Sequence, residues 1–392
     1  MQQFDLAIIG GGLVGASFAR AVSGLGLSIV LIDRASSESL YNQALDNRGL
    51  AVSYTTKHIL DELSCWEKIS KKTYPIETIH VSEHKHFGFA TLESKKYNID
   101  ALGYVVSASD LGAALLTDLE LLEGITVLRP AIIEAIVFDP TERTWCLSVA
   151  QQKFAARLIV AADGSNSILH QVQNIPIQNI NMQQSALVTN LETTTPIFTT
   201  AYERFTRHGV LALLPFGLHR AKCVFTGSNS CVTTLANCSD PEFLSRVQEF
   251  IGYRIGKFKT VAERKMFPVR HSYAESIYGD SMVLLGNAAN TLHPVAAQGF
   301  NLGVRDAVIF AKVLRHAILD GKAINEPEVL AQYAILRSSD HAKTREFTTR
   351  LVDIFADQRL YMRLYRQAGI LATQFVPALN KMIVNQGLGV CK

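Results

Sequence analysis

The stretch that decides the fold runs from Asp5 to Asp33 and reads DLAIIGGGLVGASFARAVSGLGLSIVLID. Residues 5–9 form an apolar run of strand length, and residues 28–32 form a second one. Between them, apolar residues recur at helical spacing over 13–25. A strand, a helix and a second strand in this order predict a βαβ unit, which starts a parallel sheet.

The turn between the first strand and the helix reads GGGLVG at 10–15 and matches the pattern G-x-G-x-x-G. Gly10 permits the tight turn, Gly12 leaves room for a pyrophosphate, and Gly15 lets helix and strand pack closely. The amino end of the helix offers N–H groups to the phosphates. Asp33 ends the second strand, where its carboxylate can accept hydrogen bonds from ribose hydroxyls. The unit therefore predicts a dinucleotide site, and by itself it does not separate FAD from NAD.

Length and composition are those of a globular protein with more than one domain. The 392 residues exceed what one hydrophobic core usually serves, so two intertwined domains are expected. The net charge of +3 is too small and too dispersed to indicate nucleic-acid binding. The six cysteines show no spacing typical of a metal site, and no metal is expected.

Two features of the sequence predict where the protein is located in the cell. The first strand begins within a few residues of Met1, which leaves no room for a signal peptide. No apolar run reaches the roughly 18 residues that a membrane-spanning helix needs. We therefore expect a cytoplasmic protein, with any membrane contact made peripherally at the inner face.

The residue composition and hydrophobic pattern change at two points in the rest of the chain. Residues 172–275 are rich in Thr, Val and Phe and predict a mostly antiparallel sheet, with a helix near 241–253. Residues 282–286 return to a buried-strand pattern and should rejoin the first sheet, followed by a long helix from about 299 to 318. Helices are also predicted over 51–64 and over 111–122, the second one capped by Ser109.

Three further blocks follow predicted strands or turns. They are DNRGLA at 46–51, DGSNS at 163–167, and GNAANTLHP at 286–294 continuing to QGFNLG at 298–303. In this order and spacing they resemble the FAD-dependent aromatic monooxygenases typified by para-hydroxybenzoate hydroxylase. Within that superfamily they are most similar to the hydroxylases of ubiquinone biosynthesis, and among these to the 2-octaprenyl-6-methoxyphenol hydroxylases. The resemblance covers nearly the whole chain.

The resemblance implies a cofactor, a reaction and a substrate class. FAD would be bound tightly and without a covalent link, and NAD(P)H would reduce it transiently, since the chain has no second G-x-G-x-x-G. Oxygen would then form a flavin hydroperoxide that hydroxylates the ring of a polyprenylated phenol. Two alternatives stay open. One is another FAD oxidoreductase of the same fold, such as a different aromatic hydroxylase or a prenyl reductase. The other is a non-catalytic flavin-binding subunit of a biosynthetic complex.

The same blocks supply candidate site residues. The helix starting near Gly299 would aim N–H groups at the flavin edge that becomes negative on reduction, and Asn301 could bond that edge. His293 is a candidate proton relay, although a lone histidine is more often bonded structurally, and Pro294 would fix the loop. The candidate catalytic residues are Arg48, His293 and Pro294. The candidate cofactor residues are Gly10, Gly12, Gly15, Asp33, Arg48, Asp163, Gly164, Gly286, Asn287, Gly299 and Asn301.

Three positions depart from the superfamily pattern. His170 stands where an arginine is usual, so a permanent positive charge is missing. Asn287 replaces an aspartate and can still hydrogen-bond a ribityl hydroxyl. Ala297 stands where a glycine is expected, and its methyl group is tolerated only if its φ angle is negative.

The predicted fold class is α/β, with a Rossmann-like FAD-binding domain around a parallel sheet, an inserted mostly antiparallel substrate domain, and C-terminal helices. We assign 1–75, 98–171 and 276–350 to the FAD-binding domain, 76–97 and 172–275 to the substrate domain, and 351–392 to a C-terminal helical segment. That segment interleaves apolar and basic residues. One interpretation is an amphipathic surface that contacts a membrane or a partner protein of a biosynthetic complex. The other is a helical pair packed on the body of the protein. An oligomer remains open.

Overall fold

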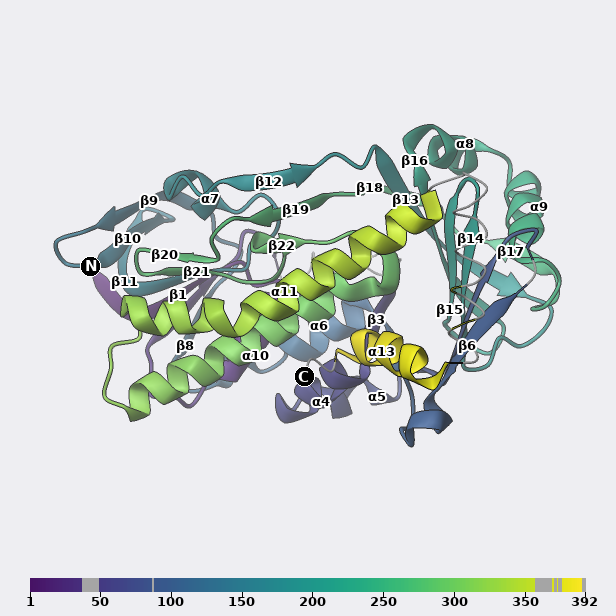
Figure 1. The fold of residues 1–392 in the computed structure, drawn as a ribbon. Coiled ribbons are helices and arrows are strands. Elements are labelled where there is room, and N and C mark those ends of the chain that lie inside the picture. The colour runs from purple at the N-terminus through teal and green to yellow at the C-terminus, as the bar shows by residue number, and fades with distance from the viewer. Residues whose placement is uncertain (37–48, 87, 357–368, 370–371, 373–375, 390–392) are drawn as a thin grey trace.

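The computed structural model describes the chain except for residues 37–48, 87, 357–368, 370–371, 373–375 and 390–392. Two large β-sheets dominate it, one toward the N-terminus on the left of Figure 1 and one on the right. A long helical pair crosses in front of the first sheet (Figure 1). The predicted α/β fold class, with a parallel-sheet domain and a mostly antiparallel one, is confirmed.

The first sheet has the strand order β20-β21-β11-β1-β2-β8. From β21 to β8 neighbouring strands run parallel, so their carboxyl ends lie along one edge. A hairpin, β9–β10, extends β11 antiparallel. The strands are β1 (Gln2–Ile9), β2 (Ile29–Ile32), β8 (Ile125–Leu128), β9 (Ile133–Asp139), β10 (Thr144–Val149), β11 (Gln152–Ala161), β20 (Tyr278–Gly279) and β21 (Met282–Leu284).

Both faces of this sheet are covered, as a parallel sheet requires. On one face lie α1 (Leu13–Val22) and α10 (Gln298–Leu319), where Phe18 stacks on Phe310 with ring centroids 5.5 Å apart. On the other face Trp145 is fully buried and donates its indole N–H to the Ser281 carbonyl at 2.9 Å. Each buried side chain of this size stabilises the fold by roughly 1.5–3 kcal/mol.

The second sheet has the order β17-β13-β16-β15-β14-β5-β6, with β18 also paired to β13. Its pairs are antiparallel except for β14 with β5. The strands are β5 (Thr78–Glu83), β6 (Phe89–Glu93), β13 (Gln184–Thr193), β14 (Thr200–Thr206), β15 (Gly209–Pro215), β16 (Arg220–Ser228), β17 (Phe258–Val261) and β18 (Lys265–Pro268).

The two faces of the second sheet differ. Helices α8 (Asn229–Asn237) and α9 (Asp240–Ile251) cover one face, where Leu211 and Phe225 are buried against Phe243. The other face, which we call the inward face, is turned toward strand β7 (Gly103–Ser107), because Ala201 and Leu214 pack with Val105. The domain boundaries drawn from the sequence stay a prediction.

Smaller elements connect the two sheets. A three-stranded sheet β3-β7-β4 lies between them, beside α4, α5 and α6, and β12-β19-β22 forms another. The bounds are β3 (Gly49–Ser53), β4 (Tyr74–Ile76), β7 (Gly103–Ser107), β12 (Ile177–Ile180), β19 (His271–Ala274), β22 (Asn290–Thr291), α4 (Tyr54–Glu62), α5 (Trp66–Ser70), α6 (Ala108–Leu116) and α7 (Ile168–Val172). Single 3₁₀ turns are η1 (Ser94–Tyr97), η2 (Leu119–Leu121), η3 (Gly286–Ala288) and η4 (Val295–Ala297).

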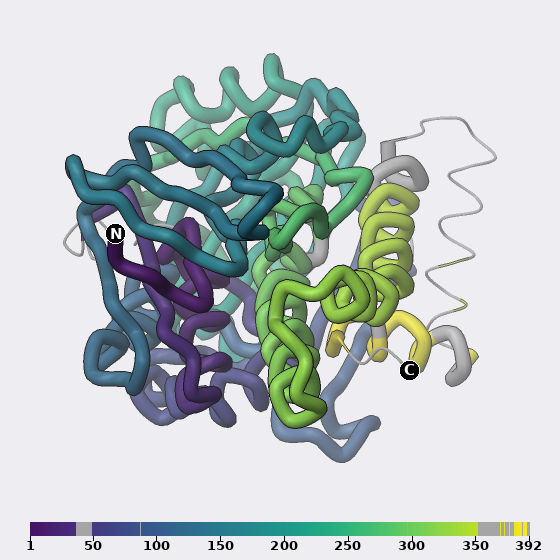
Figure 2. The backbone as a smooth tube through the Cα atoms, turned by 90° about the vertical axis from the view of Figure 1, so that its left-hand side faces the viewer, coloured from purple at the N-terminus to yellow at the C-terminus, as the bar shows by residue number. Residues whose placement is uncertain are grey.

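The C-terminal helices pack on the body. Helix α11 (Pro327–Ala356) runs along α10 (Figures 1 and 2). Helix α13 (Pro377–Leu388) buries Val384 and Leu388 against Leu92 of β6 and Leu102. In the C-terminal segment, the apolar residues Leu360, Tyr361, Leu364, Ile370, Leu371 and Phe375 lie outside the described residues.

Two sequence-based helix predictions were wrong at their ends. Residues 49–53 form strand β3, paired antiparallel with β7, and the helix begins only at Tyr54, capped by the Ser53 hydroxyl. A distant strand therefore overrides the local pattern. The second helix covers 108–116 rather than 111–122, and Ser107, not Ser109, accepts the capping bond from the Asp110 N–H.

Candidate functional site

The glycine turn lies at the carboxyl ends of the parallel strands. Gly10 has φ +95°, a conformation that L side chains rarely adopt, and an added Cβ would lie 2.6 Å from the Ala162 carbonyl. A Cβ on Gly15 would lie 1.9 Å from the Gly10 oxygen, so helix and strand touch there. A Cβ on Gly12 would meet nothing within 4 Å. The space beside Gly12 is therefore open on the side where a pyrophosphate would approach.

Asp33, directly after β2, is hydrogen-bonded to the glycine turn. One carboxylate oxygen accepts from the Gly11 N–H at 2.6 Å and from Arg129 at 2.9 Å, and the other accepts from the Ala35 N–H at 2.7 Å. Arg129 also donates to the Gly11 carbonyl at 2.8 Å. Asp33 thus fixes the glycine turn, and the contact with a ribose stays a prediction. Sequence reasoning missed Arg129, although it directly follows β8, the strand next to β2.

Asp163 and Gly164 follow β11, two strands along the same edge of the sheet. One Asp163 oxygen, Oδ2, accepts from the Ile168 N–H at 3.0 Å. The other, Oδ1, is buried and has no partner among the described residues. Burial raises the pKa of this carboxyl above its ordinary value, against the lowering effect of its hydrogen bonds. An unpaired buried oxygen of this kind indicates a ligand hydroxyl or N–H group.

The third block meets the other two. Gly286, after β21, has φ +57°, and an added Cβ would lie 3.1 Å from the Val14 side chain of α1. Asn287 is exposed, and its amide oxygen lies 3.9 Å from where a Cβ of Gly299 would stand. The beginnings of α1, η3 and α10 therefore converge at one edge of the sheet.

This convergence is the geometry of an FAD site, and comparison with known families decides it. A family model described as FAD binding domain matches residues 3–348. The chain belongs to this FAD-binding family. A protein named ubiquinone hydroxylase UbiL from Rhodospirillum rubrum is 30% identical over 99% of this chain and 90% of its own. The 3-demethoxyubiquinol 3-hydroxylase of Escherichia coli is 25% identical over 99% of both chains.

A solved structure has the same fold. The p-nitrophenol 4-monooxygenase PnpA from Pseudomonas putida superposes with a TM-score of 0.81 over 100% of both chains, at 16% identity. FAD is the cofactor of this family, and the described residues fit it. The unpaired Asp163 oxygen, the open flank of Gly12 and the exposed Asn287 amide are the groups that would hold a diphosphate and a ribityl chain.

His170, at the position where the FAD-binding family often has arginine, ties two blocks together. Its Nε2 lies 2.8 Å from the Ala288 carbonyl, and since a carbonyl only accepts, the imidazole donates. This bond links α7, which follows the Asp163 block, to η3. The histidine thus links two cofactor-binding loops by a hydrogen bond.

Asn301 is used by the protein itself. Its oxygen accepts from the Ser53 N–H, and its nitrogen donates to the Ala51 and Ala297 carbonyls, each at 2.9 Å. The amide pins β3 to the first turn of α10. Its contact with a flavin edge stays a prediction. The N–H groups in the first turn of α10 have no partner within the helix and can still donate to a ligand at this position.

Ala297 was expected to require a negative φ, and this was wrong. Its φ is +48° and its ψ is 39°, the left-handed conformation, at the start of α10. A methyl group in this region costs about 1 kcal/mol relative to glycine. The bond from the Asn301 amide to the Ala297 carbonyl offsets part of that cost.

His293 is buried and has a partner at each ring nitrogen. Nδ1 accepts from the Val295 N–H at 3.1 Å, so Nε2 carries the hydrogen and donates to Gln184 Oε1 at 2.8 Å. Burial, helped by nearby His271, lowers the pKa of His293 to about 4. The ring is therefore neutral at pH 7 and joins the loop before α10 to β13. Its role as a proton relay, like that of the exposed Pro294, stays a prediction. Arg48 lies outside the described residues.

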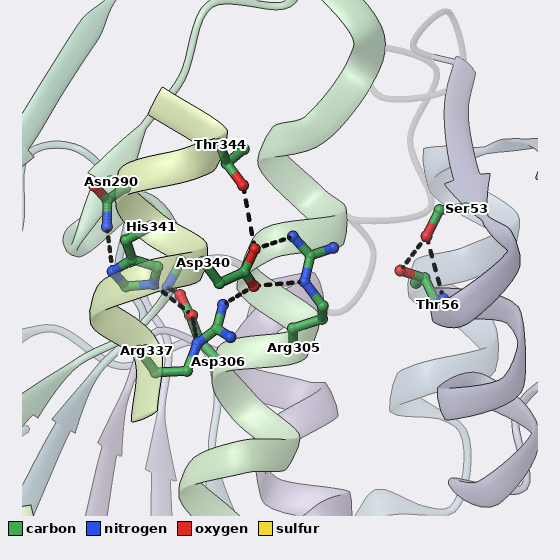
Figure 3. A network of polar contacts seen from close by, with 10 residues as sticks. Ser53, Thr56, Asn290, Arg305, Asp306, Arg337, Asp340, His341 and Thr344 are labelled. Atoms are coloured by element: carbon green, nitrogen blue, oxygen red, sulfur yellow. Dashed lines mark hydrogen bonds and ion pairs between the residues drawn. The ribbon is translucent and has the colours of Figure 1, made fainter. Parts of the chain in front are cut away.

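A buried ionic network supports the cofactor loops from behind (Figure 3). Asp306 on α10 accepts from the Gly286 N–H at 3.2 Å, from Arg337 at 2.7 Å and from His341 at 2.7 Å. Burial alone would raise the pKa of Asp306, but His341 and Arg337 lower it below its ordinary value. Asp340 bridges Arg337 to Arg305 in turn. Helix α11 is thereby locked to the loop that begins at Gly286.

Within the described residues, no helix is both long and apolar enough to cross a membrane. Among the same residues, no group of three or more His, Cys, Asp or Glu side chains is arranged to hold a metal ion.

Proposed function

We propose that this chain is an FAD-dependent monooxygenase that hydroxylates the aromatic ring of a polyprenylated phenol in ubiquinone biosynthesis, with NAD(P)H and O₂ as co-substrates. The observation that carries the proposal is the convergence of the loops after β1, β11 and β21 beside the inward face of the second sheet. The relatives named as ubiquinone hydroxylases, matched over nearly their whole lengths, supply the substrate class.

Two different parts of this chain would bind the cofactor and position the substrate. When bound, FAD takes a hydride from NAD(P)H and activates O₂. The Asp163 carboxylate and the Gly12 turn would hold the cofactor, and the N–H groups of the first turn of α10 would stabilise negative charge on its ring system. The second sheet forms the opposite wall, which positions the phenol and excludes water from it.

The test is substrate-stimulated oxidation of NAD(P)H by the full-length, FAD-loaded protein. A short-chain prenylphenol should raise the rate and yield a product heavier by one oxygen atom, derived from ¹⁸O₂. Gly12→Ala is the matched control, because it blocks the pyrophosphate path without a steric clash in the protein. A wild-type preparation that binds FAD and ignores every prenylphenol would refute the proposal. It would favour the non-catalytic subunit, whereas stimulation by an unrelated aromatic alone would favour a different hydroxylase.

A peripheral membrane contact belongs to the same proposal, because a polyprenyl tail is held in lipid. Helix α13 packs on the body through Val384 and Leu388, while its Met382 is 63% exposed and Val376, which directly precedes the helix, is 46% exposed. We infer that these two side chains touch the membrane surface. Co-sedimentation with vesicles of phosphatidylethanolamine and phosphatidylglycerol should fall on Met382→Glu and stay unchanged on the matched control Leu319→Glu, on the distant end of α10. Equal loss in both variants would contradict this contact.

A further inference from the structure

One carboxyl group on the inward face of the second sheet has no role in the fold. Glu203 lies in β14, in register with Ala212 of β15, Val224 of β16 and Val188 of β13. On its other side it pairs with Val81 of β5. Because paired residues of adjacent strands share a face, these side chains form one row across the sheet. From β5 to β13 the row is apolar except for Glu203, and beyond Val188 it continues to Lys265 of β18.

The face that carries Glu203 is opposite the one covered by helices. Tyr202 and Leu213, on the alternate positions, belong to the core under α8 and α9. Side chains alternate along a strand, so Glu203 and Ala212 point the other way. Glu203 and its neighbours Ala212 and Val224 are half-buried, whereas Leu213 is fully buried.

Two contacts place this face opposite the cofactor site. At one corner Gln184, which shares the face, receives the hydrogen bond of His293 from the loop that leads into α10. At the other corner Ala201 and Leu214 pack with β3 and β7. Strand β3 is joined in turn to the first turn of α10 through Asn301. Glu203 therefore lies on the wall that faces the amino end of α10.

The surroundings of Glu203 suit a phenol. Among the described residues it has no hydrogen-bond partner and no counter-ion. The charged side chains in register on the same face are Lys222 and Arg220 on β16, Glu192 on β13, Glu83 on β5 and Lys265 on β18. Arg220 and Glu192 lie four residues further along their strands than the Glu203 row and pair with each other. Lys222 lies two strands and two residues away, about 12 Å at usual strand spacings. Burial among apolar neighbours raises the pKa of Glu203 to about 7, which is the value a general base needs at physiological pH.

We propose that Glu203 is the base that takes the hydroxyl proton of the phenol substrate. This inference rests on the proposed hydroxylase function and adds a catalytic residue to it. The O–H bond of the phenol breaks, its proton passes to the Glu203 carboxylate, and the electron pair stays on the ring oxygen. The resulting phenolate is more electron-rich at the ring carbons that receive the new oxygen. The carboxylic acid returns the proton after hydroxylation, so the residue is unchanged by a full cycle.

The test compares Glu203→Gln with Glu192→Gln, the same substitution on β13 at a side chain that is 46% exposed and paired with Arg220. Both variants are first checked for FAD content and circular dichroism. With a short-chain prenylphenol, we expect kcat to fall about 100-fold or more in Glu203→Gln and to stay at the wild-type value in Glu192→Gln. The wild-type rate should fall as the pH drops through 7, and this limb should be absent from Glu203→Gln.

A second arm separates a base from a merely structural residue. Ring fluorination at carbons that are not hydroxylated makes the phenol more acidic, so its phenolate forms without help. The fluorinated substrate should restore most of the Glu203→Gln rate, and Glu203→Asp, which keeps a carboxylate, should retain the pH limb. Equal rates and pH profiles in wild type and Glu203→Gln, or no rescue by fluorination, would overturn the inference alone. A wild type that is inactive on every phenol would instead defeat the proposed function, and the inference with it.

Discussion

Replacing Glu203 by Gln should change the stability of the FAD-loaded protein in a pH-dependent way. The carboxyl has a pKa raised from 4.5 to about 7 in the folded chain. A carboxyl whose folded pKa is raised binds its proton more tightly when folded, so its contribution to stability is complete below pH 4.5 and is lost as the pH rises through 7. Above pH 7 the folded protein must hold a charge among apolar side chains. Glutamine has nearly the same shape and no charge.

The magnitude follows from the two pKa values. At 1.36 kcal/mol for each pKa unit, proton linkage makes Glu203→Gln more stable than wild type by about 1 kcal/mol at pH 5.5 and about 3 kcal/mol at pH 8.5. The second figure is an upper bound, because the half-buried carboxyl keeps some contact with water. Urea unfolding followed by tryptophan fluorescence measures both values, with Glu192→Gln as the control that should shift by less than about 0.5 kcal/mol. An equal difference at both pH values would refute the reasoning.

Five other substitutions test the cofactor site and its support. Gly12→Ala should fold and lose FAD, whereas Gly15→Ala should fail to fold because its methyl group would meet a backbone oxygen at 1.9 Å; 450 nm absorbance per protein and circular dichroism distinguish the two. Asp163→Ala should weaken FAD binding about 10- to 100-fold in equilibrium dialysis, and unchanged binding would remove Asp163 from the site. Ala297→Gly should raise the free energy of unfolding by about 0.5 kcal/mol in urea, since a φ of +48° suits glycine. Asp306→Asn should lower it by about 3–5 kcal/mol, and a smaller loss than 1 kcal/mol would show that the network is not coupled.

The parts of the site that sequence could predict are those fixed by the backbone within a short stretch. The turn at Gly10 requires a positive φ, and the approach at Gly15 excludes even a methyl group, so glycines mark both positions directly. The family resemblance extended this to the later blocks. Asp163 and Gly286 do follow the ends of parallel strands in the same sheet, as the apolar runs before them indicated.

The parts that sequence could not predict depend on contacts between distant segments. Residues 49–53 form a strand because β7, which is 50 or more residues away in the sequence, pairs with them. In the sequence, Asp306 is a single acidic residue on a long helix. Its partners Arg337 and His341 lie on α11 and meet it only in the folded chain. Arg129 gave no signal alone, since its meaning arises from the strand order that places β8 beside β2.

Glu203 shows the same limit most sharply. In the run Tyr202-Glu203-Arg204, alternation says only that the first and third side chains share a face. Which of the two faces lies under helices, and which opposes the cofactor loops, is set by the pairing with β15 and by the packing of α8 and α9. A glutamate in a half-exposed strand is otherwise read as a solvent-facing residue.

The two faces of the second sheet also separate what the fold needs from what the reaction needs. The centre of the helix-covered face, around Leu211, Leu213 and Phe225, is apolar and fully buried, and any similar set of large side chains would hold it together. On the inward face, an uncharged residue at position 203 would make the protein more stable at pH 7 than the glutamate that is present. A residue that lowers stability, has no partner in the described part of the chain and faces the amino end of α10 is accounted for by chemistry on a bound ring. Proteins that share this fold but act on molecules with no acidic hydroxyl should not need a carboxyl group at this point of the sheet.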